Sequence, residues 1–116
     1  CAEIIVNERH DFYDFEAKYL DDSATLVVPA ELPEGIEARV QEMAVRAFDA
    51  LACDGLARVD FFVTADGEVV LNEVNTMPGF TDISMYPRMW GATEVAYPEL
   101  VDRLVADALR KGTGLH

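Results

Sequence analysis

An Asp-Gly pair between two strand-like runs constrains this chain more than any other feature. The runs are residues 56–64 and 68–75, both rich in β-branched residues and the first also containing Phe61 and Phe62, and Ala65-Asp66-Gly67 lies between them. Asp-Gly in such a position is a strong short-range hairpin signal, whereas a helical segment would show a longer hydrophobic period. The sequence therefore predicts an antiparallel β-hairpin over residues 56–75.

The register of this hairpin determines which side chains share a face. A two-residue turn at Asp66 and Gly67 predicts the partner pairs Thr64–Val69, Phe62–Leu71, Asp60–Glu73 and Arg58–Asn75. A four-residue loop keeps this register, and a three-residue bulged loop breaks it. Because side chains alternate along a strand, one face is expected to carry Arg58, Asp60, Glu73 and Asn75. Phe62 and Leu71 on that face would bury part of it.

Asp60 and Glu73 are two carboxylates in opposite positions, and they repel each other unless something offsets their charge. A divalent cation held by both carboxylates and the amide oxygen of Asn75 would remove the conflict. Ligation by oxygen alone, with few carboxylates, is typical of magnesium shared with a nucleotide phosphate. The alternative is a solvated face on which Arg58 pairs with Asp60, and spacing alone does not decide between the two.

The segment that follows, residues 76–84, contains small residues and Gly79, which would let the backbone approach a ligand closely. Ser84 is expected to be the N-cap of a short helix over residues 84–91, whose free amides suit a carboxylate or a phosphate. An ordinary turn between a strand and a helix is the alternative.

Hydrophobic periodicity predicts the remaining elements. Apolar residues recur at three- and four-residue steps over residues 34–52 and 97–111, which indicates two amphipathic helices. Short strands are expected at residues 2–6 and 25–28. Residues 7–23 sustain neither period and are expected to form a long mobile loop. The fold class predicted from these elements is α+β.

Composition excludes several classes of function. The 116 residues are 51% hydrophobic, as expected for one soluble globular domain, and no apolar run approaches membrane-spanning length. With 9 basic and 22 acidic residues the net charge is −13, which argues against nucleic-acid or anionic-membrane partners. Cys1 and Cys53 make no disulfide framework, so a reducing compartment such as the cytoplasm is expected. A non-catalytic cation-binding module stays open, although Lys18 and Arg58 favour a phosphate site.

Three segments in the right order resemble a known family. Gly-Leu-Ala-Arg-Val-Asp at residues 55–60 and Glu-Val-Asn-Thr-Met-Pro-Gly at residues 73–79 resemble the ATP-grasp ligases. Phe-Tyr-Asp-Phe-Glu-Ala-Lys-Tyr at residues 12–19 narrows the resemblance to the D-alanine–D-alanine ligases. The resemblance covers almost the whole chain. It implies the C-terminal catalytic portion of an ATP-grasp domain, an antiparallel sheet with a central β-hairpin packed by helices, without the N-terminal and most nucleotide-binding parts.

The resemblance also implies which residues bind metal and nucleotide. Lys18 matches a lysine that contacts phosphate, and Phe62 matches a position that touches adenine. Asn72 departs from the family, which has an adenine-contacting leucine there. The neighbouring Leu71 could compensate, so the nucleotide contacts at this position stay open. The family's ligands for two Mg²⁺ ions, with Mn²⁺ as an alternative, correspond to Asp60, Glu73 and Asn75.

The catalytic and substrate-binding residues follow from the same resemblance. Arg58 and the backbone amide of Gly79 match the donors that stabilise the tetrahedral intermediate. Ser84 and the backbone at Met85 match the site for the carboxylate of the second substrate. Tyr19 matches a tyrosine that relatives making D-alanyl-D-lactate usually replace, so it favours a dipeptide product.

The implied reaction has two steps. ATP phosphorylates the carboxylate of a first D-alanine, and the amine of a second D-alanine then attacks the acyl phosphate. Residues 7–23 would close over the site and exclude water. The product would serve peptidoglycan precursor synthesis in the cytoplasm, and the implied full-length enzyme is a homodimer. A sister ligase with D-lactate or D-serine as acceptor is the alternative; Tyr19 argues against D-lactate.

Overall fold

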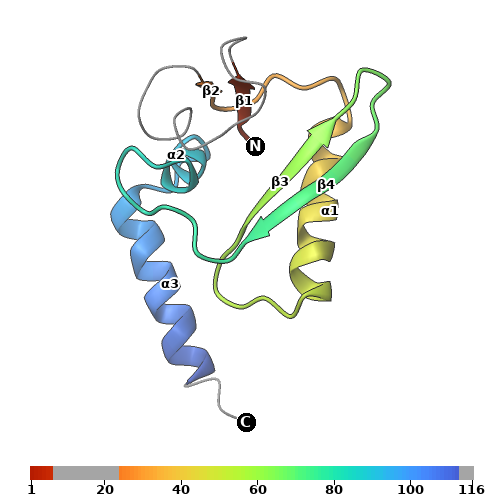
Figure 1. Cartoon of the computed structure of the whole chain (residues 1–116). Helices are drawn as coiled ribbons and strands as arrows, with labels where there is room; N and C mark the ends of the chain where they lie inside the picture. The colour runs from red at the N-terminus through yellow and green to blue at the C-terminus, as the bar shows by residue number, and fades with distance from the viewer. Residues whose placement is uncertain (7–23, 113–116) are drawn as a thin grey trace. The chain divides into compact units, whose positions relative to one another are not determined.

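A computed structural model describes residues 1–6 and 24–112 of the chain, which form two compact units, Cys1–Glu31 and Leu32–His116 (Figure 1). In the first unit, β1 (Glu3–Val6) pairs antiparallel with β2 (Ala24–Val27). The amide of Ala30 donates a hydrogen bond of 3.0 Å to the carbonyl of Cys1 and continues this pairing by one contact. Both strands were predicted to within one residue, and residues 7–23 lie outside the described residues.

The second unit begins with α1 (Ile36–Ala50), which follows Gly35 in a left-handed conformation with φ of 84°. This helix packs on the hairpin of β3 (Arg58–Val63) and β4 (Val69–Asn75), as Figure 1 shows. A Cβ placed on Gly67, in the hairpin turn, would lie 3.6 Å from the side chain of Ile36. The first turn of α1 therefore lies against the turn of the hairpin.

Two further helices, α2 (Met85–Gly91) and α3 (Tyr97–Lys111), pack against each other. Between them lies a small apolar cluster of Tyr86, Val95 and Leu100, of which Leu100 is only 4% exposed. Burying such side chains is the main favourable term in folding, at roughly 25 cal/mol per Å² of apolar surface. The partly buried side chains packed on this cluster are those of Leu56, Phe80 and Leu104.

Aromatic contacts attach the loop before α2 to this cluster. The ring of Phe80 lies 5.8 Å from that of Tyr86 and 5.4 Å from that of Tyr97, both in tilted arrangements. The hydroxyl of Tyr97 donates a 2.7 Å hydrogen bond to the carbonyl of Phe80. The segment that follows the hairpin is thereby held at Phe80 by both packing and a hydrogen bond.

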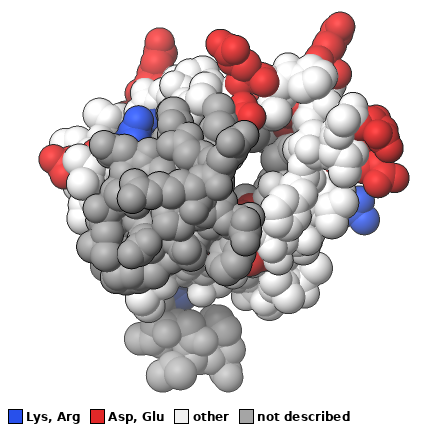
Figure 2. Space-filling view, turned by 45° about the horizontal axis from the view of Figure 1, so that its top comes forward, with Lys and Arg blue, Asp and Glu red and all other residues white. Residues whose placement is uncertain are grey.

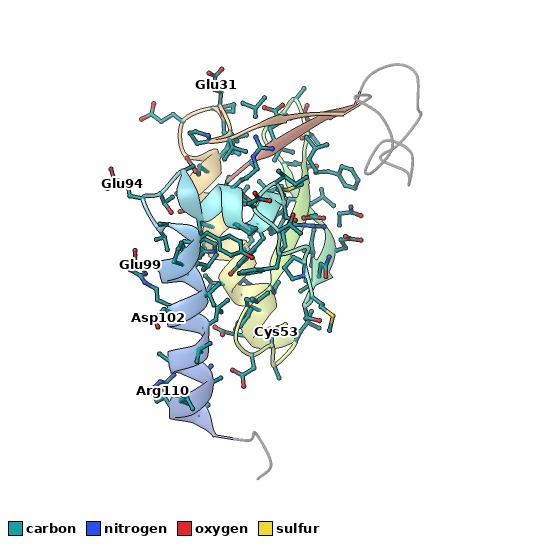
Figure 3. The ribbon with its side chains drawn as sticks, turned by 90° about the vertical axis from the view of Figure 1, so that its left-hand side faces the viewer. Glu31, Cys53, Glu94, Glu99, Asp102 and Arg110 are labelled. Atoms are coloured by element: carbon teal, nitrogen blue, oxygen red, sulfur yellow. The ribbon has the colours of Figure 1, made fainter. Side chains whose placement is uncertain are left out.

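Charged groups tie the end of α3 to the loop after α1. The ammonium of Lys111 pairs with the carboxylate of Asp54 and, at 2.9 Å, with that of Asp107. The hydrogen bond from Lys111, followed by that from the Gly55 amide, lowers the pKa of Asp54. Arg110 also pairs with Asp107 at 2.7 Å, and Figure 3 shows Glu99, Asp102 and Arg110 along α3.

These elements confirm the α+β class and the central antiparallel hairpin packed by helices. Acidic side chains are spread widely over the face drawn in Figure 2, in keeping with the charge of −13. Within residues 1–6 and 24–112, no helix has the length and apolar character needed to cross a membrane.

Candidate active site

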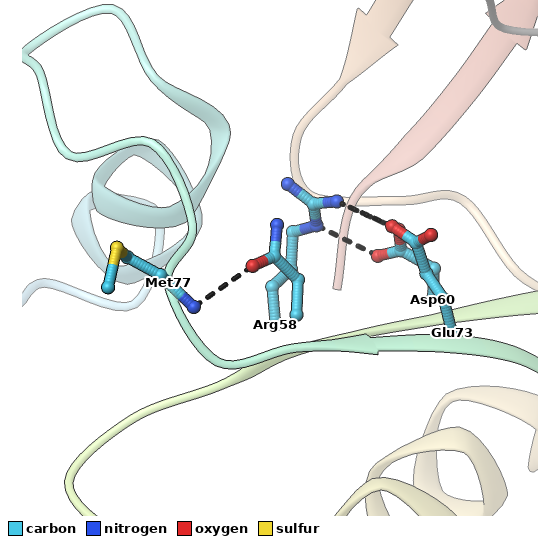
Figure 4. A network of polar contacts seen from close by, with 5 residues as sticks. Arg58, Asp60, Glu73 and Met77 are labelled. Carbon is cyan, nitrogen blue, oxygen red and sulfur yellow. Dashed lines mark hydrogen bonds and ion pairs between the residues drawn. The ribbon is translucent and has the colours of Figure 1, made fainter.

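The charged residues of the hairpin lie together as predicted. Arg58 pairs with Asn75, and Asp60 pairs with Glu73, in the antiparallel ladder of β3 and β4. Cross-strand partners project to the same side, and residues two apart on one strand share a face. Arg58, Asp60 and Glu73 accordingly project from one side of the hairpin, the side away from α1 in Figure 4.

The register nearer the turn differs from the prediction. Phe62 pairs with Val70 rather than Leu71, and Val63 pairs with Val69, because the ladder shifts by one residue after Asp60. Asn72 is the residue left without a partner in this register, as in a β-bulge. The predicted pairs Phe62–Leu71 and Thr64–Val69 were therefore wrong.

The turn explains why the prediction failed there. The amide of Thr64 donates to the carbonyl of Glu68 at 2.9 Å, so the loop contains three residues, Ala65-Asp66-Gly67, rather than two. Gly67 has a φ of 87°, the left-handed conformation that closes a three-residue hairpin loop. The extra turn residue shifts the register by one, and the bulge at Asn72 restores it before Asp60 and Glu73.

The burial expected from Phe62 and Leu71 is also not observed. Phe62 lies on the charged face but is 61% exposed, and Leu71 is turned to the opposite face with 45% exposure. The charged face is thus flanked by an open aromatic side chain, in the position where the resemblance implies adenine contact.

Arg58 is the centre of the charged network. Its guanidinium donates to both carboxylate oxygens of Asp60, from Nε and from Nη2, each at 2.9 Å (Figure 4). Nη2 also contacts Oε1 of Glu73 at 3.4 Å, a longer and weaker contact. The ion pair between Arg58 and Asp60, which the sequence suggested as the alternative to a metal site, is therefore present. It offsets the repulsion between the carboxylates of Asp60 and Glu73.

Asn75 connects the charged face to the next segment. Its Oδ1 accepts a 2.9 Å hydrogen bond from the amide of Met77, which bends the chain directly after β4. An amide oxygen has two lone pairs, so Oδ1 can accept this bond and still coordinate a cation. The same side chain would then hold the metal and shape the loop beside it.

The donor set of this face fits magnesium. The described residues contain no group of three or more His, Cys, Asp and Glu side chains arranged to hold a metal. A cation here would rely on Asp60, Glu73 and the Asn75 amide, and its other ligands would have to be phosphate oxygens or water. Magnesium prefers such sites, keeping part of its shell for water and substrate phosphates. Asp60 and Glu73 have side chains 24% and 50% exposed, so an ion can reach both.

The segment after the hairpin brings Gly79 next to Ser84. A Cβ built on Gly79 would lie 3.1 Å from Oγ of Ser84, closer than ordinary side-chain contacts. Ser84 occupies the N-cap position of α2, as predicted, but its side chain makes no capping hydrogen bond. Pro87 stands at the third position of the helix, where the usual amide donor is missing. The Ser84 hydroxyl instead contacts Thr81.

Lys18 and Tyr19 lie in residues 7–23, outside the described residues, so the structure leaves their roles as predictions. The contacts that sequence reasoning missed are the bulge at Asn72, the Asn75–Met77 hydrogen bond and the Thr81–Ser84 pair. Each has a weak local signal: asparagine is disfavoured inside strands, and Asn and Thr side chains commonly close turns over two or three residues.

Known proteins share both the sequence and the fold. Residues 1–106 match the protein family described as D-ala D-ala ligase C-terminus. The chain is 61% identical over 114 residues to the D-alanine–D-alanine ligase of Streptomyces griseus subsp. griseus. This match covers 98% of the chain and 29% of that enzyme, so the chain spans about three tenths of the curated relative.

Solved structures are also similar to this chain in fold. The VanG D-Ala:D-Ser ligase from Enterococcus faecalis has a TM-score of 0.77 and 40% identity, covering 90% of this chain and 30% of that one. The D-alanine–D-alanine ligase from Bacillus anthracis complexed with ATP has a TM-score of 0.70 and 33% identity, covering 87% of this chain and 32% of that one. By its sequence match and its fold, the chain belongs to the D-alanine–D-alanine ligase family, whose C-terminal part it matches.

Proposed function

We propose that this chain is the C-terminal catalytic part of an ATP-dependent D-alanine–D-alanine ligase. Because the chain spans only 29% of the Streptomyces griseus relative, the proposal concerns the full-length protein that contains it. The observation that carries it is the single hairpin face with Arg58, Asp60, Glu73 and Asn75, in a chain of this family.

The first half-reaction transfers the γ-phosphoryl group of ATP to the carboxylate of one D-alanine, giving an acyl phosphate. Asp60, Glu73 and Asn75 would hold two Mg²⁺ or Mn²⁺ ions, which supply charge neutralisation at the transferring phosphoryl group. Phe62, 61% exposed on the same face, offers an apolar surface to the adenine ring. Lys18, by its match to the family, would contact a phosphate.

In the second half-reaction the amine of another D-alanine attacks the acyl phosphate and displaces phosphate. Arg58 and the backbone amide of Gly79 would donate to the oxyanion of the tetrahedral intermediate. Ser84 and the backbone of Met85 would bind the carboxylate of this second substrate. The proximity of Gly79 to the Ser84 hydroxyl supports this arrangement, because it puts the two groups at one place.

The acceptor is proposed to be D-alanine. The VanG relative is named as a D-Ala:D-Ser ligase, so D-serine is the second candidate acceptor. The 61% identity to a D-alanine–D-alanine ligase favours D-alanine, and Tyr19 argues against D-lactate. The ratio of kcat/KM for D-alanine and D-serine in the acceptor site, measured by dipeptide analysis, decides between the two.

The proposed setting is the cytoplasm, where ATP is available and the dipeptide enters peptidoglycan precursor synthesis. Residues 7–23 are proposed to close over the reacting groups, which would protect the acyl phosphate from hydrolysis. The full-length enzyme is proposed to act as a homodimer without nucleic-acid or membrane partners.

The test uses the full-length protein with ATP, Mg²⁺ and D-alanine, and follows formation of ADP and dipeptide. Replacing Glu73 with Gln should lower turnover by about 100-fold or more, because metal stabilisation of a transferring phosphoryl group is worth several kcal/mol. The melting temperature without metal should stay level or rise slightly, since the change relieves a like-charge pair.

Glu68→Gln is the matched control, because Glu68 lies on the same hairpin just before the start of β4. It should leave both turnover and melting unchanged. A Glu73→Gln enzyme that melts lower and still makes dipeptide at a near-normal rate would contradict the metal assignment. Wild-type protein without D-alanine-dependent ADP formation would contradict the proposed function itself.

A further inference from the structure

The hydroxyl of Ser84 is held by one residue, Thr81. The amide of Thr81 donates to Ser84 Oγ at 3.0 Å, and the two hydroxyl oxygens lie 2.7 Å apart. The amide of Ser84 in turn donates to the Thr81 carbonyl at 3.0 Å, closing a tight turn over Asp82 and Ile83. Three hydrogen-bonding contacts therefore join these two residues.

The direction of the hydroxyl–hydroxyl bond decides what Ser84 can offer a ligand. A hydroxyl has one proton and two acceptor lone pairs. One lone pair of Ser84 Oγ already accepts the Thr81 amide. If Ser84 donates to Thr81, its proton is used and its remaining lone pair repels a carboxylate. If Thr81 donates, both lone pairs are occupied and the Ser84 proton is available.

Space around Ser84 supports the second arrangement. Ser84 is half-buried, and its Oγ lies where a Cβ on Gly79 would come within 3.1 Å. Because residue 79 has no side chain, no Cβ at that position crowds the Ser84 hydroxyl. Ser84 is also free of a capping role, since its side chain makes no cap hydrogen bond to α2.

We infer that Thr81 is a positioning residue that makes Ser84 a pure hydrogen-bond donor toward the carboxylate of the acceptor D-amino acid. This inference rests on the proposed function, and it adds a residue to it. Thr81 does not itself touch the substrate: it donates its hydroxyl proton to Ser84 Oγ, and Ser84 donates its own proton to the carboxylate oxygen.

The experiment measures steady-state kinetics of the full-length enzyme with D-alanine, separating the KM of the donor site from that of the acceptor site. Thr81→Val removes the hydroxyl but keeps the shape and the amide. It should raise the acceptor-site KM by about 10-fold, because a hydrogen bond to a charged group is weakened. The KM of the donor site and the KM for ATP should stay unchanged. Thr81→Ser, which keeps the hydroxyl, should restore the acceptor-site KM.

A double-mutant cycle separates positioning from a merely structural role. If Thr81 acts through Ser84, the Thr81→Val/Ser84→Ala enzyme should have the same acceptor-site KM as Ser84→Ala alone. Thr93→Val is the matched control, because the Thr93 hydroxyl donates its hydrogen bond to the Trp90 carbonyl, at 2.9 Å, and not to Thr81 or Ser84. It should leave all three KM values unchanged.

Three results would overturn the inference. Multiplicative effects of Thr81→Val and Ser84→Ala would show that the two residues act separately. An unchanged acceptor-site KM in either single variant would remove the role of that hydroxyl while leaving ligase activity in place. Wild-type enzyme without D-alanine-dependent turnover would instead overturn the proposed function, and this inference with it.

Discussion

The charged face of the hairpin and the apolar cluster between α2 and α3 are held together by opposite means. On the hairpin face, Arg58, Asp60 and Glu73 interact through ion pairs while remaining partly open to solvent. In the cluster, Tyr86, Val95 and Leu100 make apolar contacts and are each at most 9% exposed.

The difference between the hairpin face and the apolar cluster shows which region contributes mainly to stability and which carries the reactive groups. Like-charge groups across a ladder cost stability, and they persist where a ligand makes use of them. Apolar burial offers no chemistry but orders the segment that carries Phe80 and, beyond it, Ser84. Substitutions in the cluster should therefore act mainly on stability, and substitutions on the hairpin face mainly on metal response and turnover.

The largest effect on stability is expected for Leu100→Ala. Leu100 is 4% exposed at the centre of the cluster, and truncation leaves a cavity that costs about 2–4 kcal/mol. Leu109→Ala on the same helix is the control, because Leu109 is 79% exposed and should lose little. Amide hydrogen exchange of α2 and α3 in the full-length protein measures the local opening free energy. Equal protection in the two variants would show that the cluster does not stabilise these helices.

An intermediate effect is expected for Arg58→Gln in metal-free protein. The change leaves Asp60 opposite Glu73 without the guanidinium that now bonds both, and should cost about 1.5–3 kcal/mol. Mg²⁺ should recover part of the loss, because a bound cation replaces the missing charge. Thermal melting with and without Mg²⁺ checks this.

Arg103→Gln is the matched control for that change. Arg103 makes a 2.7 Å ion pair with Glu99 on the exposed surface of α3, and such pairs contribute about 0–1 kcal/mol. Its melting temperature should change little and should not depend on Mg²⁺. If Mg²⁺ raises the melting temperature of both arginine variants equally, the ion does not act at the hairpin face.

The smallest effect is expected for Lys111→Met, and it should depend on pH. Hydrogen bonds to Lys111 lower the pKa of Asp54 and of Asp107 below the ordinary value of 3.8, and Asp54 raises the pKa of Lys111 above 10.5. The lowered acid pKa values stabilise the fold above pH 3.8, and this is lost as pH falls through them. The raised lysine pKa stabilises the fold below pH 10.5, and this is lost as pH rises through it.

Wild-type protein should therefore melt slightly higher than Lys111→Met between about pH 5 and pH 9, and the difference should vanish at both extremes. Salt near 1 M should reduce it, because these groups are exposed or partly exposed to solvent. A difference that persists below about pH 3 would point to packing of the lysine stem rather than to charge.

Local patterns predicted the elements well because periodicity and capping signals act within a few residues. Ser84 and Gly112 flank α2 and α3 as predicted, and both strands of the hairpin begin and end within two residues of expectation. The partner pairs Asp60–Glu73 and Arg58–Asn75 were also correct, but partly by compensation. An Asp-Gly turn is compatible with two-residue and three-residue loops. The three-residue loop shifts the register by one residue relative to the prediction, and the bulge at Asn72 cancels that shift.

Contacts between residues far apart in the sequence were harder to predict. The stripe of α3 showed that Leu100 and Leu104 face inward, yet nothing in its period identifies Phe80 and Leu56 as the groups they pack near. The contact between the Thr81 and Ser84 hydroxyls was likewise not predicted, because it depends on the turn that brings these two residues together. Family resemblance assigned roles to residues, but the contacts between them came from the folded chain.

The bulge at Asn72 divides the hairpin into two parts that pair in different registers. Residues 61–71 form a tip whose ladder runs in one register, while Arg58–Asp60 and Glu73–Asn75 form a base that runs in another. Because Asn72 takes up the difference of one residue between the two registers, the length of the turn and the position of the bulge together set which side chains of the base face each other. For an engineer, the turn at residues 65–67 is therefore a poor insertion point, because the tip carries Phe62 on the charged face and Gly67 lies against Ile36 of α1.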